Sequence, residues 1–74
     1  MTIRRFFRLL RLLAEWHTKE ELGRRLSRST RGILRDLNLL QDLGFAVRRR
    51  KSARQRPQWC VVGASRTLAK LARP

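Results

Sequence analysis

The sequence predicts a mainly α-helical domain with a small β-hairpin, built as a three-helix core, a hairpin and a short C-terminal helix. Apolar residues recur at helical spacing in the first half of the chain, and capping residues divide them into three segments. Two β-prone runs enclose a strongly basic stretch in the second half, as expected for a hairpin. The 74 residues suffice for one small core, so residues 1–74 are expected to form a single domain.

The first helix is expected over residues 2–15. Phe6, Leu10 and Leu13 share one face at about 100° per residue, with arginines on the opposite side. The apolar arc is wider than one neighbouring helix would cover, because Phe7 extends it at one edge. Either the domain's own sheet or tail covers the excess, or this helix forms a dimer contact.

The second helix is expected over residues 19–26, after a short link at residues 16–17. Thr18 and Glu21 have the spacing of a capping box, in which each side chain bonds the other residue's backbone N–H. Gly23 disfavours the helix by roughly 1 kcal/mol relative to alanine. We therefore expect another helix to approach closely at this glycine.

The third helix, expected over residues 30–43, has two different sides. Ser29 is a good N-cap residue, and Gly44 can adopt the left-handed conformation that ends a helix. One side carries the aliphatic residues Ile33, Leu37 and Leu40. The opposite side carries the polar residues Arg31, Arg35 and Asn38. This pattern indicates a helix that is held by a core on one side and is free to enter a DNA major groove on the other.

The hairpin is expected over residues 45–62. Its middle, residues 48–56, contains six bases and no acid, so this stretch cannot belong to a core. It either contacts a polyanion or forms a disordered, solubilising loop. A last short helix is expected over residues 65–72, with Leu68 and Leu71 as a small apolar stripe.

The formal net charge is +14, from 19 Lys and Arg against five Asp and Glu. So much positive charge on a small domain opposes compaction and calls for a polyanionic partner. The bases are mostly arginine, since the lysines are Lys19, Lys51 and Lys70 alone. Arginine forms bidentate contacts with phosphate and with guanine. Nucleic acid is therefore the first candidate partner, and an anionic membrane surface is the second.

Few residues offer other chemistry. Cys60 is the single cysteine, which excludes an internal disulfide, fits a reducing compartment and predicts a buried strand residue. His17 is expected in a loop, without a metal-ligand cluster, and Asp36 is expected to orient an arginine. Trp16 and Trp59 are expected in the core or an interface, with stacking on bases as the alternative. We expect no enzyme, no cofactor and no membrane span.

The order of helix, capped helix, turn, helix and basic hairpin comes with a particular set of residues. They are Thr18-Lys-Glu-Glu-Leu22-Gly23, Leu26-Ser-Arg-Ser29, Ile33-Leu-Arg35-Asp36-Leu37, Leu40 and Gly44-Phe45. This set lies within residues 5–62, most of the chain, and resembles the winged helix-turn-helix domains of the DeoR type and related small repressors. Three residues depart from that pattern: Gly23 replaces the usual alanine, Arg28 an aliphatic residue, and Gly32 a common threonine.

The resemblance implies sequence-specific binding of double-stranded DNA and control of transcription, with residues 29–43 as the recognition helix and the hairpin as the wing. Base contacts are then expected from Thr30, Arg31, Leu34, Arg35 and Asn38. Backbone or wing contacts are expected from Arg28, Ser29, Arg48, Arg49, Arg50, Lys51, Arg54 and Arg56. The expected protein is a small repressor-like regulator, of the kind carried by phages or mobile elements. It would be cytoplasmic and nucleoid-associated, without an effector domain, and able to dimerise through its first or last helix.

Two other functions fit the same composition. The protein can bind DNA architecture or RNA without sequence preference, in which case selection from random duplexes returns no enriched motif. It can also be an adaptor that binds a protein through the apolar face of its first helix. Such a complex survives high salt, in which phosphate contacts fail.

Overall fold

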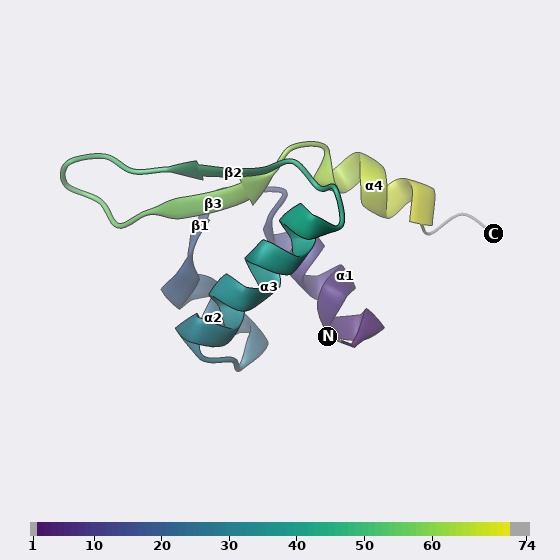
Figure 1. The fold of residues 1–74 in the computed structure, drawn as a ribbon, viewed down its shortest axis with the longest axis horizontal. Helices are drawn as coiled ribbons and strands as arrows, with labels where there is room; N and C mark the ends of the chain where they lie inside the picture. Colours follow the sequence, from purple (N-terminus) through teal and green to yellow (C-terminus); the bar gives the residue numbers. More distant parts are fainter. Residues whose placement is uncertain (1, 72–74) are drawn as a thin grey trace.

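The computed structural model describes residues 2–71, with the side chains of residues 65, 67, 68 and 71 left aside. The elements are α1 (Ile3–Leu12), β1 (His17–Thr18), α2 (Lys19–Leu26), α3 (Thr30–Asp42), β2 (Val47–Arg50), β3 (Gln58–Val61) and α4 (Ala64–Leu71). The strands form an antiparallel sheet in the order β1-β3-β2. Figure 1 shows this sheet along one side of the helices, with the β2–β3 hairpin projecting at one end and α4 at the other. A mainly helical domain with a hairpin is thus confirmed.

The core lies between the first three helices and the sheet. Its residues are Leu9, Leu10, Leu13, Leu22, Leu26, Ile33, Leu37, Leu40, Val61 and Ala64, all buried. The aliphatic side of α3 is therefore the buried side, as its spacing predicts. The predicted Leu68 and Leu71 stripe lies outside the described side chains.

Two short-range caps that the sequence predicts are present. The Thr18 hydroxyl accepts a hydrogen bond from the backbone N–H of Glu21 at 3.1 Å, and the Glu21 carboxylate accepts one from the backbone N–H of Thr18. The Ser29 hydroxyl accepts a hydrogen bond from the backbone N–H of Gly32 at 3.1 Å. Both caps satisfy donors that a helix leaves unpaired at its start. They set where α2 and α3 begin.

The first helix is shorter than its sequence pattern predicts. It ends at Leu12 rather than near residue 15, and the predicted link after it contains β1. The carbonyl oxygen of Leu13 accepts a hydrogen bond from the backbone N–H of Val61 at 2.8 Å, so this residue already belongs with the sheet. His17, expected in a loop, pairs with Trp59 across β1 and β3. A strand of two residues has no periodicity that a sequence can show.

Other boundaries differ by a few residues. The strands of the hairpin occupy Val47–Arg50 and Gln58–Val61, so the first three residues of the predicted basic loop belong to a strand. The helix predicted over residues 30–43 ends at Asp42, and the last helix begins at Ala64. These shifts are the usual uncertainty at element ends.

The wide apolar arc of α1 is partly covered by the domain itself. The ring of Phe6 packs edge-on against Phe45, with centroids 5.8 Å apart, and α4 packs against α1. Leu12 is half-buried against the core. Ile3, near the start of the helix, stays 74% exposed. Phe45 and α4 thus cover part of the arc, in line with the expectation that the domain's own chain does so.

The turn between α2 and α3 is unusually close to α2. Ser27 adopts the left-handed conformation with φ of 53°, and the backbone N–H of Arg28 donates to the Gly23 carbonyl at 2.8 Å. A Cβ atom on Gly23 would lie 2.6 Å from the carbonyl oxygen of Arg28. The expected close approach at this glycine is real: the backbone of the turn comes closest, and Ile33 Cγ1 of α3 lies 4.0 Å from the same Cβ position.

We predict that Gly23→Ala lowers the free energy of unfolding by about 1 kcal/mol, although alanine is usual here in the family that the sequence resembles. Alanine gains roughly 1 kcal/mol in helix propensity. Its Cβ collides with backbone, and overpacking of this kind costs about 1–3 kcal/mol. Urea denaturation measures the difference, with Arg24→Ala at the neighbouring exposed position as control. A variant more stable than the wild type would contradict the prediction.

Candidate nucleic-acid interface

The outward side of α3 is exposed over its length. Thr30, Arg31, Arg35 and Asn38 are all exposed, as the sequence pattern predicts. Leu34 differs, because it is half-buried and packs against the core, which leaves only part of its side chain for a ligand. Of the two acids in this helix, Asp36 is buried and Asp42 is exposed at the last residue. The outward side therefore presents positive charge over most of the helix.

The buried acid holds two arginines from other parts of the chain. Arg28 Nε lies 2.9 Å from Asp36 Oδ2, and Arg28 Nη2 donates to Asp36 Oδ1 at 3.3 Å. Arg5 Nε of α1 lies 3.8 Å from the same Oδ2 atom. The side chain of Asp36 is 6% exposed and both arginine side chains are 28% exposed. Asp36 thus joins α1, the turn and α3 in one ion-pair network.

This network explains two of the departures from the family pattern. A Cβ atom on Gly32 would lie 2.7 Å from Arg28 Nε, so the arginine side chain passes over the glycine on its way to Asp36. Arg28 needs the space that Gly32 leaves. Arg28 is predicted to contact phosphate, but in the structure its guanidinium lies on the carboxylate of Asp36. The expectation that Asp36 orients an arginine is correct, with Arg28 and Arg5 as the arginines.

The hairpin arginines point to two different faces of the sheet. Arg49 pairs with Trp59, its guanidinium 5.8 Å from the centre of the indole ring, and Trp59 packs against the core. Arg48 pairs with Cys60, and the side chains of neighbouring strand residues alternate between faces. Burial raises the pKa of the Cys60 thiol, and the charges of Arg50 and Arg48 offset this in part. Cys60 lies in a strand as predicted, but it is half-buried rather than buried.

Arg50 is held in place from two directions. Its Nε donates to Gln58 Oε1 at 2.9 Å, and its guanidinium lies 4.4 Å from the centre of the Trp16 ring. Trp16 is half-buried, and such stacking of a cation on an aromatic face stabilises by about 0.5–2 kcal/mol. The tip of the hairpin beyond Arg50 is exposed and carries Lys51 and Arg54. The hairpin thus offers ordered arginines on its strands and freely accessible ones at its tip.

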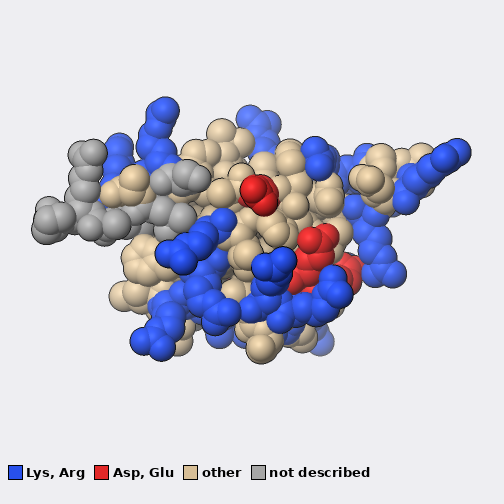
Figure 2. Space-filling model, turned by 180° about the vertical axis from the view of Figure 1, so that it is seen from behind, with Lys and Arg blue, Asp and Glu red and all other residues tan. Residues whose placement is uncertain are grey.

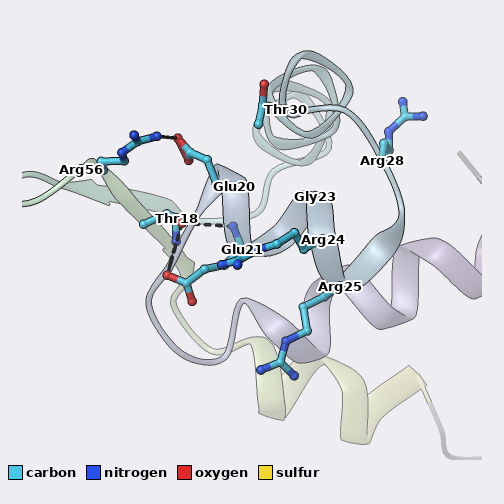
Figure 3. Close-up of a pocket in the computed structure, with 9 residues that line it drawn as sticks. All are labelled: Thr18, Glu20, Glu21, Gly23, Arg24, Arg25, Arg28, Thr30 and Arg56. Carbon is cyan, nitrogen blue, oxygen red and sulfur yellow. Dashed lines mark hydrogen bonds and ion pairs between the residues drawn. The ribbon is translucent and has the colours of Figure 1, made fainter.

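A cleft of about 1010 Å³ separates α2 from the hairpin and the start of α3. Figure 3 shows Glu20, Arg56 and Thr30 around its mouth, with Arg28 and Arg25 pointing away from its centre. Arg56 Nη1 donates to Glu20 Oε1 at 2.9 Å and ties the hairpin to α2. Burial acts to raise the pKa of Glu20, but hydrogen bonds from Arg56 and backbone lower it below its ordinary value. The hairpin is therefore held against α2 at one side of this cleft.

Two other features, a metal-ligand cluster and a membrane-spanning helix, are not found in the described part of the chain. No group of three or more His, Cys, Asp or Glu within residues 2–71 is placed to hold a metal ion. None of the helices described is both long and apolar enough to cross a bilayer. The chain matches no family model, no curated protein and no solved structure. Assignment of a class rests on the residues and geometry above.

Proposed function

We propose that this chain is a winged helix-turn-helix domain that binds double-stranded DNA. In this proposal α3 is the recognition helix in the major groove, and the β2–β3 hairpin is the wing along the backbone or in the minor groove. More particularly, we propose a small, repressor-like regulator of transcription, similar in its DNA-binding unit to domains of the DeoR type. The proposed nucleoid-associated location and a homodimer follow from the same assignment.

The observation that carries this proposal is the division of α3 into two sides. The aliphatic residues and Asp36 are buried, while Arg31, Arg35 and Asn38 are exposed on the other side. An α-helix fits the major groove, which is about 12 Å wide. Arginine can pair bidentately with guanine there, and asparagine with adenine. A side that is both exposed and rich in these residues supports base reading by α3.

The surroundings of α3 support contacts to the DNA backbone. Ser29, Thr30 and Arg31 at the start of α3 are exposed, and helix N-termini favour phosphate. The hairpin, tied to α2 through Glu20 and Arg56, carries exposed bases at Arg48, Lys51 and Arg54. Contacts of this kind position a protein on the duplex without reading its sequence.

Selection from a pool of random duplexes tests the proposal directly. The full chain is incubated with the pool at physiological salt, bound duplexes are recovered and amplified, and the enriched sequences are determined. A recurrent motif of several base pairs is expected, repeated in two half-sites if the protein binds as a dimer. Tight binding with no enriched motif would replace the proposal by structure-selective or non-specific binding of nucleic acid. A stoichiometric protein complex stable at high salt would favour the adaptor instead.

A further inference from the structure

A second basic surface lies on α1 and the end of α2. Arg4, Arg8 and Arg11 are exposed and follow the i, i+4, i+7 spacing of one helix side. The buried leucines of α1 are on the opposite side of the helix. Arg8, Arg11 and Arg25 line a shallow hollow of about 180 Å³ together with Leu12. We name Arg4, Arg8, Arg11 and Arg25 the rear surface.

The rear surface lies away from the proposed DNA contacts of α3. In Figure 1 α1 lies behind α3, and in Figure 2, which is seen from behind, Lys and Arg side chains gather over the region of α1 and α2. The domain measures 22 and 20 Å along its two shorter axes. DNA has a persistence length of about 50 nm and bends at a cost of several kcal/mol over one short site. One straight duplex on α3 is therefore too stiff to reach the rear surface as well.

The charge of the rear surface is not neutralised by the protein. Within residues 2–71, the ion pairs join Asp36 to Arg5 and Arg28 and Glu20 to Arg56, so the four rear arginines have no acidic partner. Arg8 Nη2 donates instead to the backbone carbonyl of Arg25 at 3.0 Å, which draws two guanidinium-bearing residues together. Like charges at such spacing repel one another unless an anion lies between them. The surface therefore has the charge that a polyanion-binding site needs.

We propose that the rear surface binds the backbone of a second DNA duplex, so that one domain bridges two segments. This inference rests on the proposed function, in which α3 holds the first segment. From residue 4 to residue 11, α1 rises by about 10.5 Å, and each DNA strand has a phosphate every 3.4 Å along the axis. This length covers about three phosphate spacings, so each of the three arginines can reach a phosphate of the same strand. Because these contacts are to phosphates and not to bases, they are electrostatic and independent of sequence.

A capture assay tests the bridge. One duplex about two helical turns long is attached to beads, the full-length protein is bound to it, and a fluorescent duplex of unrelated sequence is added. The wild type is expected to retain the fluorescent duplex at low salt. Arg4→Gln with Arg11→Gln is expected to reduce this capture about tenfold, because two phosphate contacts are lost. Affinity for a single free duplex, measured by anisotropy, is expected to stay within about threefold.

The controls separate the rear surface from total charge and from folding. Arg48→Gln with Arg54→Gln removes the same charge from the hairpin and is expected to weaken single-duplex binding instead. Arg4→Lys with Arg11→Lys keeps the charge and is expected to retain most of the capture. Arg25→Gln gives a second, independent variant of the rear surface if thermal unfolding shows that the first variant is not folded.

Two results would overturn the inference. If folded Gln variants of the rear surface capture as much fluorescent duplex as the wild type does, the bridge is formed by a dimer of the protein and not by the rear surface. An equal loss of capture and single-duplex affinity would show that all contacts are to one duplex. The capture assay uses arbitrary sequences, so it reports on the rear surface even if the random-pool selection enriches nothing and the proposed regulatory function fails.

Discussion

Asp36→Ala is expected to lower the free energy of unfolding by about 3 kcal/mol, which is a large part of the stability of so small a domain. The carboxylate is almost fully buried and holds Arg28 at 2.9 Å and Arg5 at 3.8 Å. Its removal leaves the guanidinium groups of Arg28 and Arg5 close together, without the negative charge that pairs with both. Both keep some access to water, which places the loss at the lower end of the range for buried ion pairs. Urea denaturation measures this loss, with the wild type and the variant fitted with one common m value, the slope of the free energy of unfolding against urea concentration.

Two further variants show whether the ion pairs are the cause. Asp42→Ala removes the same charge from an exposed position of the same helix and is expected to change stability by less than about 0.5 kcal/mol. Arg28→Leu with Asp36→Leu replaces the closest pair by apolar residues, and we expect it to recover much of the loss. If Asp36→Ala and Asp42→Ala are equally stable, the network does not hold α1, the turn and α3 together.

Arg35→Ala is expected to weaken binding to the selected duplex by about 1–3 kcal/mol and to relax the preference at one base pair. The side chain is exposed at the middle of α3, on the side away from the core. A bidentate contact to a base distinguishes sequences, whereas a contact to phosphate does not. Fluorescence anisotropy with the selected duplex and with a random duplex measures both affinities.

The matched variant for Arg35 lies at the tip of the hairpin. Arg54→Ala is expected to weaken both duplexes alike and to reduce the slope of log K against log salt by about one. Arg54 is a better test position than Arg50. Arg50 also donates a hydrogen bond to Gln58 and stacks on Trp16, so its loss would disturb the sheet as well. Equal losses on the selected and the random duplex for Arg35→Ala would show that α3 does not read bases.

Much of the helical framework could be predicted because it depends on residues close together in the chain. The capping box joins Thr18 to Glu21, and the cap of α3 joins Ser29 to Gly32, each over three residues. The buried side of α3 follows from helical periodicity alone. The exposure of Arg31 and Arg35 follows from the same periodicity, since residues opposite a buried stripe face solvent.

The remaining features depend on partners that are distant in sequence. The strand at His17 exists because β3 supplies its partner, and α1 ends early because the carbonyl of Leu13 bonds to Val61. Asp36 lies next to Arg35 in sequence but pairs with Arg28. The Arg28 side chain can reach it because Gly32, which has no side chain, leaves room for it.

The sequence by itself determined where the helices begin, which of their sides are apolar and that the chain is strongly basic. Those properties come from local hydrogen bonds, the helical repeat and net charge. Only the tertiary structure decided which arginines are occupied by acids and which remain exposed for a ligand. The chain has five acids for 19 bases, so most bases have no acid to pair with. Packing sets the burial of each charge and its distance from the others, and these determine which charges are paired.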